Sequence, residues 1–310
     1  MQRDQILKTS FTLATVLTIS GMAGCQHSDD STSVPTGNLT IAVTDSPIDD
    51  ATAVYISFTG LTLFASDGGK SEINFAEPKV VDLLSLQGNS SQEILSEYAI
   101  PTGEYSYATF DIDFDASYME TSTGDFTFQA SNLRNAGTIL KDILLNDGDA
   151  GPSIAPFSVQ QDATTHLTFD FDLRKSIFAE DVSNVLSFSP AIRSVVTNES
   201  GTIAGTLNAS LFDNLVCIDT SSAVYAYSGS NEALKDIRGK SSDPISTANI
   251  TVSAGRSYEI GFLPAGNYTL AVACNASGDL ADEEEAQLLF RGKKSVTVIE
   301  NSTTNGDLTL

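Results

Sequence analysis

Tryptophan is absent from this chain of 310 residues, which contains only two histidines and three cysteines. Zinc sites and most nucleophile–base pairs are built from histidine and cysteine, so little of that chemistry is available. The missing tryptophan argues against a glycoside hydrolase and against a tryptophan platform for sugars. The motifs of zinc proteases, α/β-hydrolases and dinucleotide-binding proteins are missing too. These absences predict a protein that is not an enzyme.

Basic residues are also scarce. The chain has 16 Lys and Arg against 40 Asp and Glu, a formal net charge of −24. Such a chain repels phosphate backbones and anionic lipid surfaces, which excludes a basic nucleic-acid-binding face. Hydrophobic residues make up 41% of the chain, enough for packed cores, so a wholly disordered chain is excluded. The length predicts about two domains.

The first residues have the pattern of an export signal. Arg3 and Lys8 are followed by an uncharged run over 11–23, shorter than the ~20 apolar residues that span a bilayer. The run ends in Met-Ala-Gly-Cys at 22–25, which resembles the lipobox of bacterial lipoproteins. The resemblance implies that residues 1–25 are a lipoprotein signal peptide ending at Cys25, whose sulfur receives lipid with acyl chains such as palmitate. An ordinary secretory signal is the alternative.

Residues 26–37 are rich in Ser, Thr, Asp, Pro and Gly, which is typical of a flexible tether. In enteric lipoproteins an Asp after the lipidated cysteine retains the protein at the inner membrane. Gln26 occupies that position here, so the resemblance implies a lipid anchor in the outer membrane. The pattern leaves open whether the protein faces the periplasm or the cell surface.

With Cys25 lipidated, Cys217 and Cys274 remain as a pair in an oxidising compartment. A disulfide between them would close a loop of ~57 residues and stabilise the fold by roughly 4 kcal/mol in the chain-entropy model. Two free buried thiols are the alternative.

Short runs of alternating apolar and polar residues predict strands throughout the rest of the chain. A polar break at 198–201 separates a β-rich domain over 38–197 from a second one over 201–310. Ser90 and Glu93 have capping-box spacing, which predicts a short helix to about Tyr98. The pattern does not decide between helix and strand for Thr138–Leu145. The expected fold class is all-β, with two β-sandwich domains and minor short helix.

The first half resembles the bacterial lipoprotein family called domain of unknown function 4382. The resemblance covers about residues 38–197 and rests on Leu39–Asp49, Val54–Thr59, Asp82–Gly88, Ile100–Tyr105, Phe169–Ser176 and Pro190–Arg193, in that order. It implies an exported β-rich domain without an assigned activity.

The second half is similar, more weakly, to the carboxypeptidase-regulatory or prealbumin-like sandwich. The similarity rests on Gly201–Gly205 and on Phe262–Leu270, where a Pro-x-Gly turn leads into a strand opened by Tyr268. Modules of this kind usually act as accessory or spacer domains.

Alternating acidic residues are the candidate ligand-binding groups. Strand geometry places Asp111, Asp113 and Asp115 in a row ~6.7 Å apart on the face away from the core, and Asp170 and Asp172 in the same way on a later strand. Neighbouring strands would bring up to five carboxylates together, a ligand set suited to Ca²⁺. Arg174 and Lys175 could neutralise the carboxylates instead, and a simple acidic surface is the further alternative.

Two other acidic groups raise the same question. Asp45, Asp49 and Asp50 surround a Ser-Pro turn and form an alternative calcium cluster, in which Asp45 is expected to accept an Asx-type bond from backbone N–H groups. The acidic run over 279–285 lacks EF-hand spacing and is expected to be a solvated loop tip.

These patterns together predict a non-enzymatic cell-envelope lipoprotein that acts as a binding or scaffolding module, with an acidic surface and calcium as a candidate stabilising ion. Its expected partners are the membrane, through the lipid, and an envelope polysaccharide or protein. The alternatives are a structural spacer without a small ligand and a carboxylate-dependent glycan hydrolase.

Overall fold

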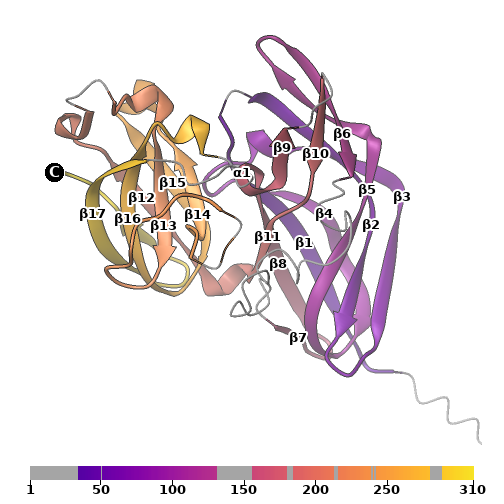
Figure 1. Ribbon diagram of the computed structural model, residues 1–310. Helices are drawn as coiled ribbons and strands as arrows, with labels where there is room; N and C mark the ends of the chain where they lie inside the picture. Colours follow the sequence, from indigo (N-terminus) through magenta and orange to yellow (C-terminus); the bar gives the residue numbers. More distant parts are fainter. Residues whose placement is uncertain are drawn as a thin grey trace, which may run out of the picture. The chain divides into compact units, whose positions relative to one another are not determined.

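The computed structural model of the chain (Figure 1) describes residues 34–49, 51–130, 156–179, 184–212, 216–238, 240, 242–279 and 288–310. The expected signal peptide with Cys25, most of the tether, Asp50 and Thr138–Leu145 lie outside the described residues. Residues 34–310 belong to one compact unit.

The first half of the described chain forms two sheets. A four-stranded sheet has the order β11-β8-β1-β4, and a seven-stranded sheet has the order β3-β2-β5-β6-β10-β9, with β7 paired to β5. Their strands are β1 (Thr36–Ser46), β2 (Ala51–Ala65), β3 (Lys70–Asp82), β4 (Gln92–Pro101), β5 (Gly103–Thr121), β6 (Gly124–Ala130), β7 (Phe157–Val159), β8 (Thr164–Asp172), β9 (Ile177–Ala179), β10 (Val185–Phe188) and β11 (Ile192–Val196).

Aromatic side chains fill the space between these two sheets. Phe58 and Phe110 of the larger sheet contact Phe171 of the smaller sheet, and Phe110 also meets Phe169 edge to face, with ring centroids 5.1–5.5 Å apart. All four rings are buried. The inward alternation that the sequence predicts for β5 and β8 is therefore confirmed.

The second half forms another pair of sheets, with the orders β15-β12-β18 and β14-β13-β16-β17. Their strands are β12 (Ser200–Thr206), β13 (Ala223–Ser228), β14 (Ser246–Asn249), β15 (Ser257–Pro264), β16 (Gly266–Cys274), β17 (Leu289–Val298) and β18 (Thr303–Asn305). The predicted disulfide is present: Cys217 and Cys274 are joined, with 4.6 Å between their Cα atoms, inside the apolar core of this half. The all-β fold of two sandwiches is thus confirmed.

Among the residues that the structure describes, helical structure is confined to single turns. They are α1 (Leu173–Ser176) and the 3₁₀ turns η1 (Leu83–Ser85), η2 (Thr197–Glu199), η3 (Ala209–Phe212), η4 (Asp219–Ser221), η5 (Val252–Ala254) and η6 (Ala276–Gly278). Within the described ranges, every helix is too short or too polar to span a bilayer.

The helix predicted from Ser90 to about Tyr98 is wrong, because the chain from Gln92 onward forms β4, paired antiparallel with β1. The pairing shifts register around Ile41, and Glu97 has a positive φ of 45°. Such irregularities let the adjacent residues Ile94 and Leu95 both be buried. Two buried neighbours break the alternation that marks a strand in a sequence.

The two halves share a local motif, Pro-x-Gly-x-Tyr, at the start of β5 and of β16. In each, the tyrosine hydroxyl donates a hydrogen bond to the proline carbonyl four residues earlier, at 2.8 Å for Tyr105 and 2.7 Å for Tyr268. The glycine of the first motif, Gly103, has a φ of 145°, which a residue with a side chain rarely adopts. The motif fixes the turn before a central strand in each sandwich.

We expect Tyr105→Phe and Tyr268→Phe each to lower the free energy of unfolding by about 0.5–1.5 kcal/mol, the net value of one hydrogen bond. Urea denaturation measures the change. Tyr98→Phe is the control, since Tyr98 is 42% exposed. Losses no larger than that of the control would contradict a role for the motif in stability.

Candidate functional site

The outer face of β8 and the adjacent helix α1 contact the second half of the chain, and we call this contact the joint. Arg174 of α1 is fully buried there. Its guanidinium donates to the Ala276 carbonyl at 2.8 Å and to Oδ1 of Asn249 at 3.1 Å, and forms an ion pair with Asp49 at 2.6 Å. One side chain of the first half therefore binds two segments of the second.

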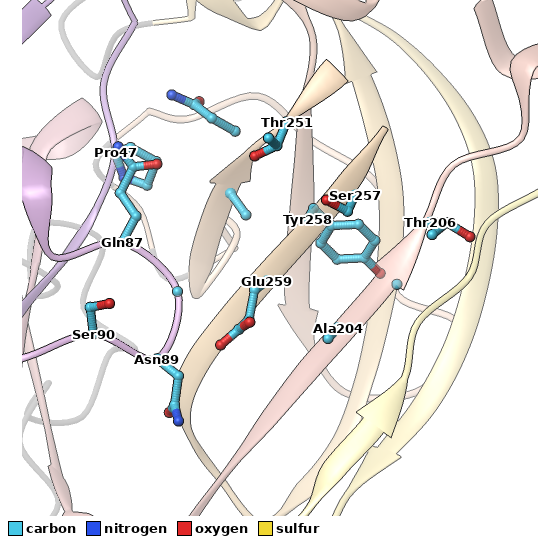
Figure 2. A pocket seen from close by; sticks show the side chains of 14 residues that line it. Pro47, Gln87, Asn89, Ser90, Ala204, Thr206, Thr251, Ser257, Tyr258 and Glu259 are labelled. Atoms are coloured by element: carbon cyan, nitrogen blue, oxygen red, sulfur yellow. The ribbon is translucent and has the colours of Figure 1, made fainter. Parts of the chain in front are cut away.

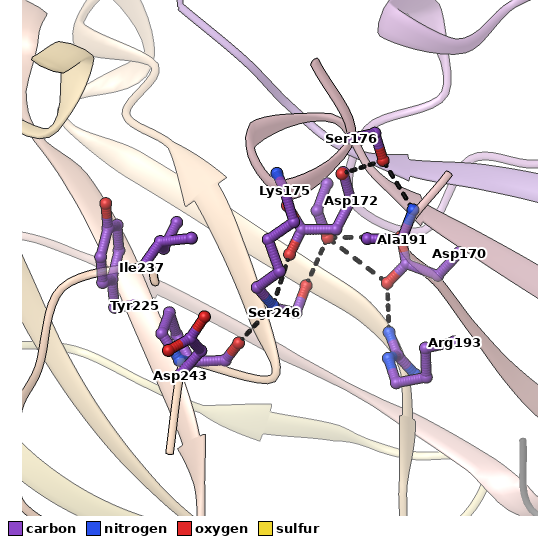
Figure 3. A network of polar contacts seen from close by, with 12 residues as sticks. Asp170, Asp172, Lys175, Ser176, Ala191, Arg193, Tyr225, Ile237, Asp243 and Ser246 are labelled. Carbon is purple, nitrogen blue, oxygen red and sulfur yellow. Dashed lines mark hydrogen bonds and ion pairs between the residues drawn. The ribbon is translucent and has the colours of Figure 1, made fainter. Parts of the chain in front are cut away.

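Lys175 makes the next connection across the joint. Its Nζ donates to the Pro244 carbonyl at 2.6 Å and pairs with Asp172 at 2.8 Å. Asp172 also caps α1, because its Oδ1 accepts the backbone N–H of Lys175 at 3.2 Å. The Lys175 and Asp172 side chains lie beside Ser246 of the second half (Figure 3).

Arg193 of β11 completes the set. It lies opposite Asp170 in the register of β11 with β8, and its guanidinium donates to the Asp170 carboxylate (Figure 3). The same guanidinium donates to the Phe262 carbonyl of β15. Ser46 adds a hydrogen bond to Ser246 at 2.7 Å. Each of the three bases, Arg174, Lys175 and Arg193, thus has both a carboxylate and a carbonyl acceptor.

The structure does not bring the predicted acidic ladder together. Asp170 and Asp172 are only 4% and 6% exposed, so the expectation that they face water is wrong; the second half covers that face of β8. Asp111, Asp113 and Asp115 lie on β5 in the other sheet, where Asp111 and Asp115 are exposed. No group of three or more His, Cys, Asp or Glu in the described part of the chain could hold a metal ion. Calcium stays a prediction.

The alternative cluster around the Ser-Pro turn is also divided. Asp49 pairs with Arg174, and Asp50 lies outside the described residues. Asp45 is 4% exposed, and neither of its carboxylate oxygens has a hydrogen-bond partner. The Asx-type bond expected for Asp45 is therefore wrong.

Asp279, expected in a solvated loop tip, is fully buried. Its carboxylate accepts the Tyr225 hydroxyl at 2.7 Å and the backbone N–H of Ile237 at 3.1 Å. Burial raises the pKa of Asp279 to about 6, although both hydrogen bonds oppose the shift. This residue anchors the end of the acidic run inside the second sandwich.

Four described carboxylates of the first half reach the joint, Asp45, Asp49, Asp170 and Asp172; three of them pair with Arg174, Lys175 and Arg193, and Asp45 is left without an ion pair. Burial, reinforced by the charges of Asp170 and Asp172, raises the pKa of Asp45 well above its usual range. Arg174 opposes this shift only in part. The unpaired carboxyl is the group that gives up its charge most readily.

Asp45→Asn should remove a pH dependence from the free energy of unfolding. The pKa of Asp45 is raised in the folded state. The contribution of its protonated side chain to the free energy of unfolding is therefore complete below the unfolded-state pKa of about 4, and it is lost as the pH rises through the folded-state pKa. Above about pH 4, the free energy of unfolding of the variant should therefore rise relative to that of the wild type by about 1.4 kcal/mol per pH unit, until Asp45 has ionised in the folded wild type. Urea denaturation between acidic and alkaline pH tests this.

Asp111→Asn is the matched control for this comparison, because Asp111 is exposed on β5. If the difference in free energy of unfolding between Asp45→Asn and the wild type stays constant with pH, the raised pKa of Asp45 in the folded state is contradicted.

A polar cleft of about 630 Å³ opens beside the joint (Figure 2). One wall is Pro47 with the loop Gln87–Ser90. Thr44 holds this loop, since its hydroxyl lies 2.8 Å from the Leu86 carbonyl and 2.7 Å from that of Ser90. Gly261 lets the loop approach β15, because a Cβ there would lie 2.2 Å from the Gly88 carbonyl oxygen.

The second half forms the other wall. Ala204 and Thr206 of β12 lie opposite Glu259 and Ser257 of β15, all on the outer face of the sheet. Tyr258, between them, points into the core, and its hydroxyl donates to the Gly306 carbonyl at 2.6 Å. Ala248, Asn249 and Thr251 complete the lining.

Sequence reasoning missed this cleft. Its polar side chains come from segments more than a hundred residues apart and follow no spacing rule. The one local signal is the Gln87–Gly88 end of a motif that carries the family resemblance. His166 lies at an exposed position of β8 and is not in the cleft lining.

Fold and site together define a β-protein of two sandwiches, held by buried ion pairs beside a polar cleft. The chain belongs to the family described as "Domain of unknown function (DUF4382)", whose model matches residues 36–190. No curated protein matches the chain.

Several solved structures are distantly similar. A putative adhesin from Bacteroides ovatus is 10% identical with a TM-score of 0.23, covering 94% of this chain and 95% of that one. The minor pilin of Streptococcus agalactiae is 9% identical with a TM-score of 0.20, covering 87% and 94%. The Bacillus anthracis TIE protein is 11% identical with a TM-score of 0.21; 89% of this chain spans 34% of that one. Similarities this low carry no argument about function.

Proposed function

We propose that this chain is a non-enzymatic binding module of the cell envelope, anchored in the outer membrane by lipid on Cys25, with the cleft beside the joint as its ligand site. The cleft is the observation that carries the proposal. Its volume of about 630 Å³ is within the range of small-ligand sites. Its two walls come from the two halves of the chain, whose contact is fixed by buried ion pairs.

The lining supports binding rather than hydrolysis. Glycoside hydrolysis needs two carboxyl groups flanking the bond, and among the described residues that line the cleft Glu259 is the only carboxylate. A serine nucleophile needs an adjacent base, and the part of the lining that the structure describes contains no histidine or lysine. The partner that the sequence predicts, an envelope polysaccharide or protein, would meet a preformed site.

A structural spacer is the second candidate. It is supported by the joint itself, where Arg174, Lys175 and Arg193 each bind a backbone carbonyl of the second half. Such bonds fix two sandwiches without requiring a ligand. The two candidates differ in whether the cleft must stay open.

Blocking the cleft separates them. Ala204→Trp places a large ring between its walls, and we expect the full chain carrying it to lose retention on isolated envelope material, because the ligand can no longer enter. Ala99→Trp is the matched control, since Ala99 is exposed on β4 and outside the lining. Co-sedimentation measures retention. Equal retention of the two variants and the wild type would favour the spacer.

The anchor is tested separately. The proposed lipid on Cys25 predicts that the full chain partitions into the outer-membrane fraction and that Cys25→Ser shifts it to the soluble fraction, because several acyl chains together are needed for stable anchoring. Fractionation with immunoblotting, and the intact mass of the wild type, provide the readouts. A wild-type mass without lipid would contradict the anchor.

A further inference from the structure

Two asparagine side chains in the cleft are held in one orientation. Oδ1 of Asn249 accepts a hydrogen bond from Arg174 at 3.1 Å, and Oδ1 of Asn89 accepts one from the Thr202 hydroxyl at 3.3 Å. Both amide oxygens are therefore engaged, and the NH₂ groups have no partner among the described residues. Two amide groups whose donors are not used within the described residues therefore border the cleft, Asn89 on one wall and Asn249 on the other.

The matching acceptor is Glu259. Its carboxylate lies between the loop that carries Asn89 and the strand that carries Ala204 (Figure 2). Its stem is held against the loop, since a Cβ on Gly88 would lie 3.2 Å from Cβ of Glu259. It has no ion pair or hydrogen bond within the described part of the chain. An ionised carboxylate offers several acceptor positions and no donor.

The remaining lining is small and uncharged. Thr251 and Ser257 contribute hydroxyl groups, while Pro47, Ala204 and Ala248 are the compact apolar residues. The described lining residues include no Lys or Arg, so an anionic ligand would meet Glu259 in a strongly negative protein without a counter-charge from them. The aromatic ring of the lining, Tyr258, is buried and cannot stack on a ligand.

We propose that the cleft binds a neutral saccharide through hydrogen bonds from Asn89 and Asn249 and to Glu259; this deepens the proposed function and rests on it. A sugar hydroxyl both donates and accepts, so neighbouring hydroxyls can accept from an amide and donate to the carboxylate. A peptide segment is less well matched, because peptide grooves rely on apolar or aromatic anchor pockets.

Arg174 is a positioning residue in this scheme. It holds the Asn249 amide while it neutralises Asp49 in the joint. The contact that fixes the two sandwiches therefore also orients a donor of the cleft.

The test is isothermal titration of the detergent-solubilised full chain with three probes: short neutral oligosaccharides, uronic-acid oligosaccharides and a lysine-rich peptide. We expect binding of at least one neutral oligosaccharide and none of the acidic ones. Glu259→Gln and Asn249→Ala should each weaken it by about 10- to 100-fold, as expected for losing a hydrogen bond to a charged or buried group. Glu77→Gln, the same change at an exposed position on β3, should leave binding unchanged.

Several results would overturn the inference. If the acidic sugar or the peptide binds and Glu259→Gln weakens that binding, the cleft is still a ligand site. The proposal that its ligand is a neutral saccharide is then refuted. If a neutral sugar binds with the same affinity to the wild type, Glu259→Gln and Asn249→Ala, the cleft is not its binding site and the proposal is refuted. Failure of all three probes refutes the saccharide, and if Ala204→Trp also leaves envelope retention unchanged, the proposed function fails with it.

Discussion

The structure depends on neutralising the carboxylates that β8 carries into the joint. A buried ionised carboxylate without a partner is costly, so covering this face requires a base for nearly every acid. Arg193 neutralises Asp170 and Lys175 neutralises Asp172, and each base also binds a carbonyl of the second half. The pairing therefore makes the second sandwich part of the stability of the first. Removing one base would leave a buried carboxylate without its ion-pair partner and a backbone carbonyl without its hydrogen-bond donor.

The same contact shapes the cleft beside it. Asn249 is reached by Arg174, and the loop that carries Asn89 is held by Thr44, the neighbour of Asp45. A polar site built this way is preorganised, because its side chains are positioned before any ligand arrives. A substitution in the joint would therefore change the positions of side chains in the cleft, even where the substituted residue does not contact a ligand.

Alternation along single strands predicted the first core correctly, since Phe110 and Phe169 point inward as their spacing requires. The same rule failed for Asp170, because alternation tells which face of a strand a residue occupies but not what covers that face. The error over Ile94 and Leu95 has a local cause, an irregular pairing that no single-strand pattern contains. The disulfide followed from counting cysteines. The cleft could not be predicted from the sequence, since its walls meet only through tertiary contacts.

Charge scarcity explains why the joint and the cleft differ. Only 16 residues of the chain are Lys or Arg, and three of them lie in the joint, Arg174 and Lys175 buried and Arg193 half-buried, where the alternative is uncompensated charge. None of the described residues that line the cleft is basic, and the carboxylate of Glu259 remains in contact with water, where an isolated charge costs little. A site left with one carboxylate and fixed amides selects against anions by repulsion and must recognise its ligand by hydrogen bonds. The acidity of the chain is thus a determinant of what the cleft can accept as well as of its surface.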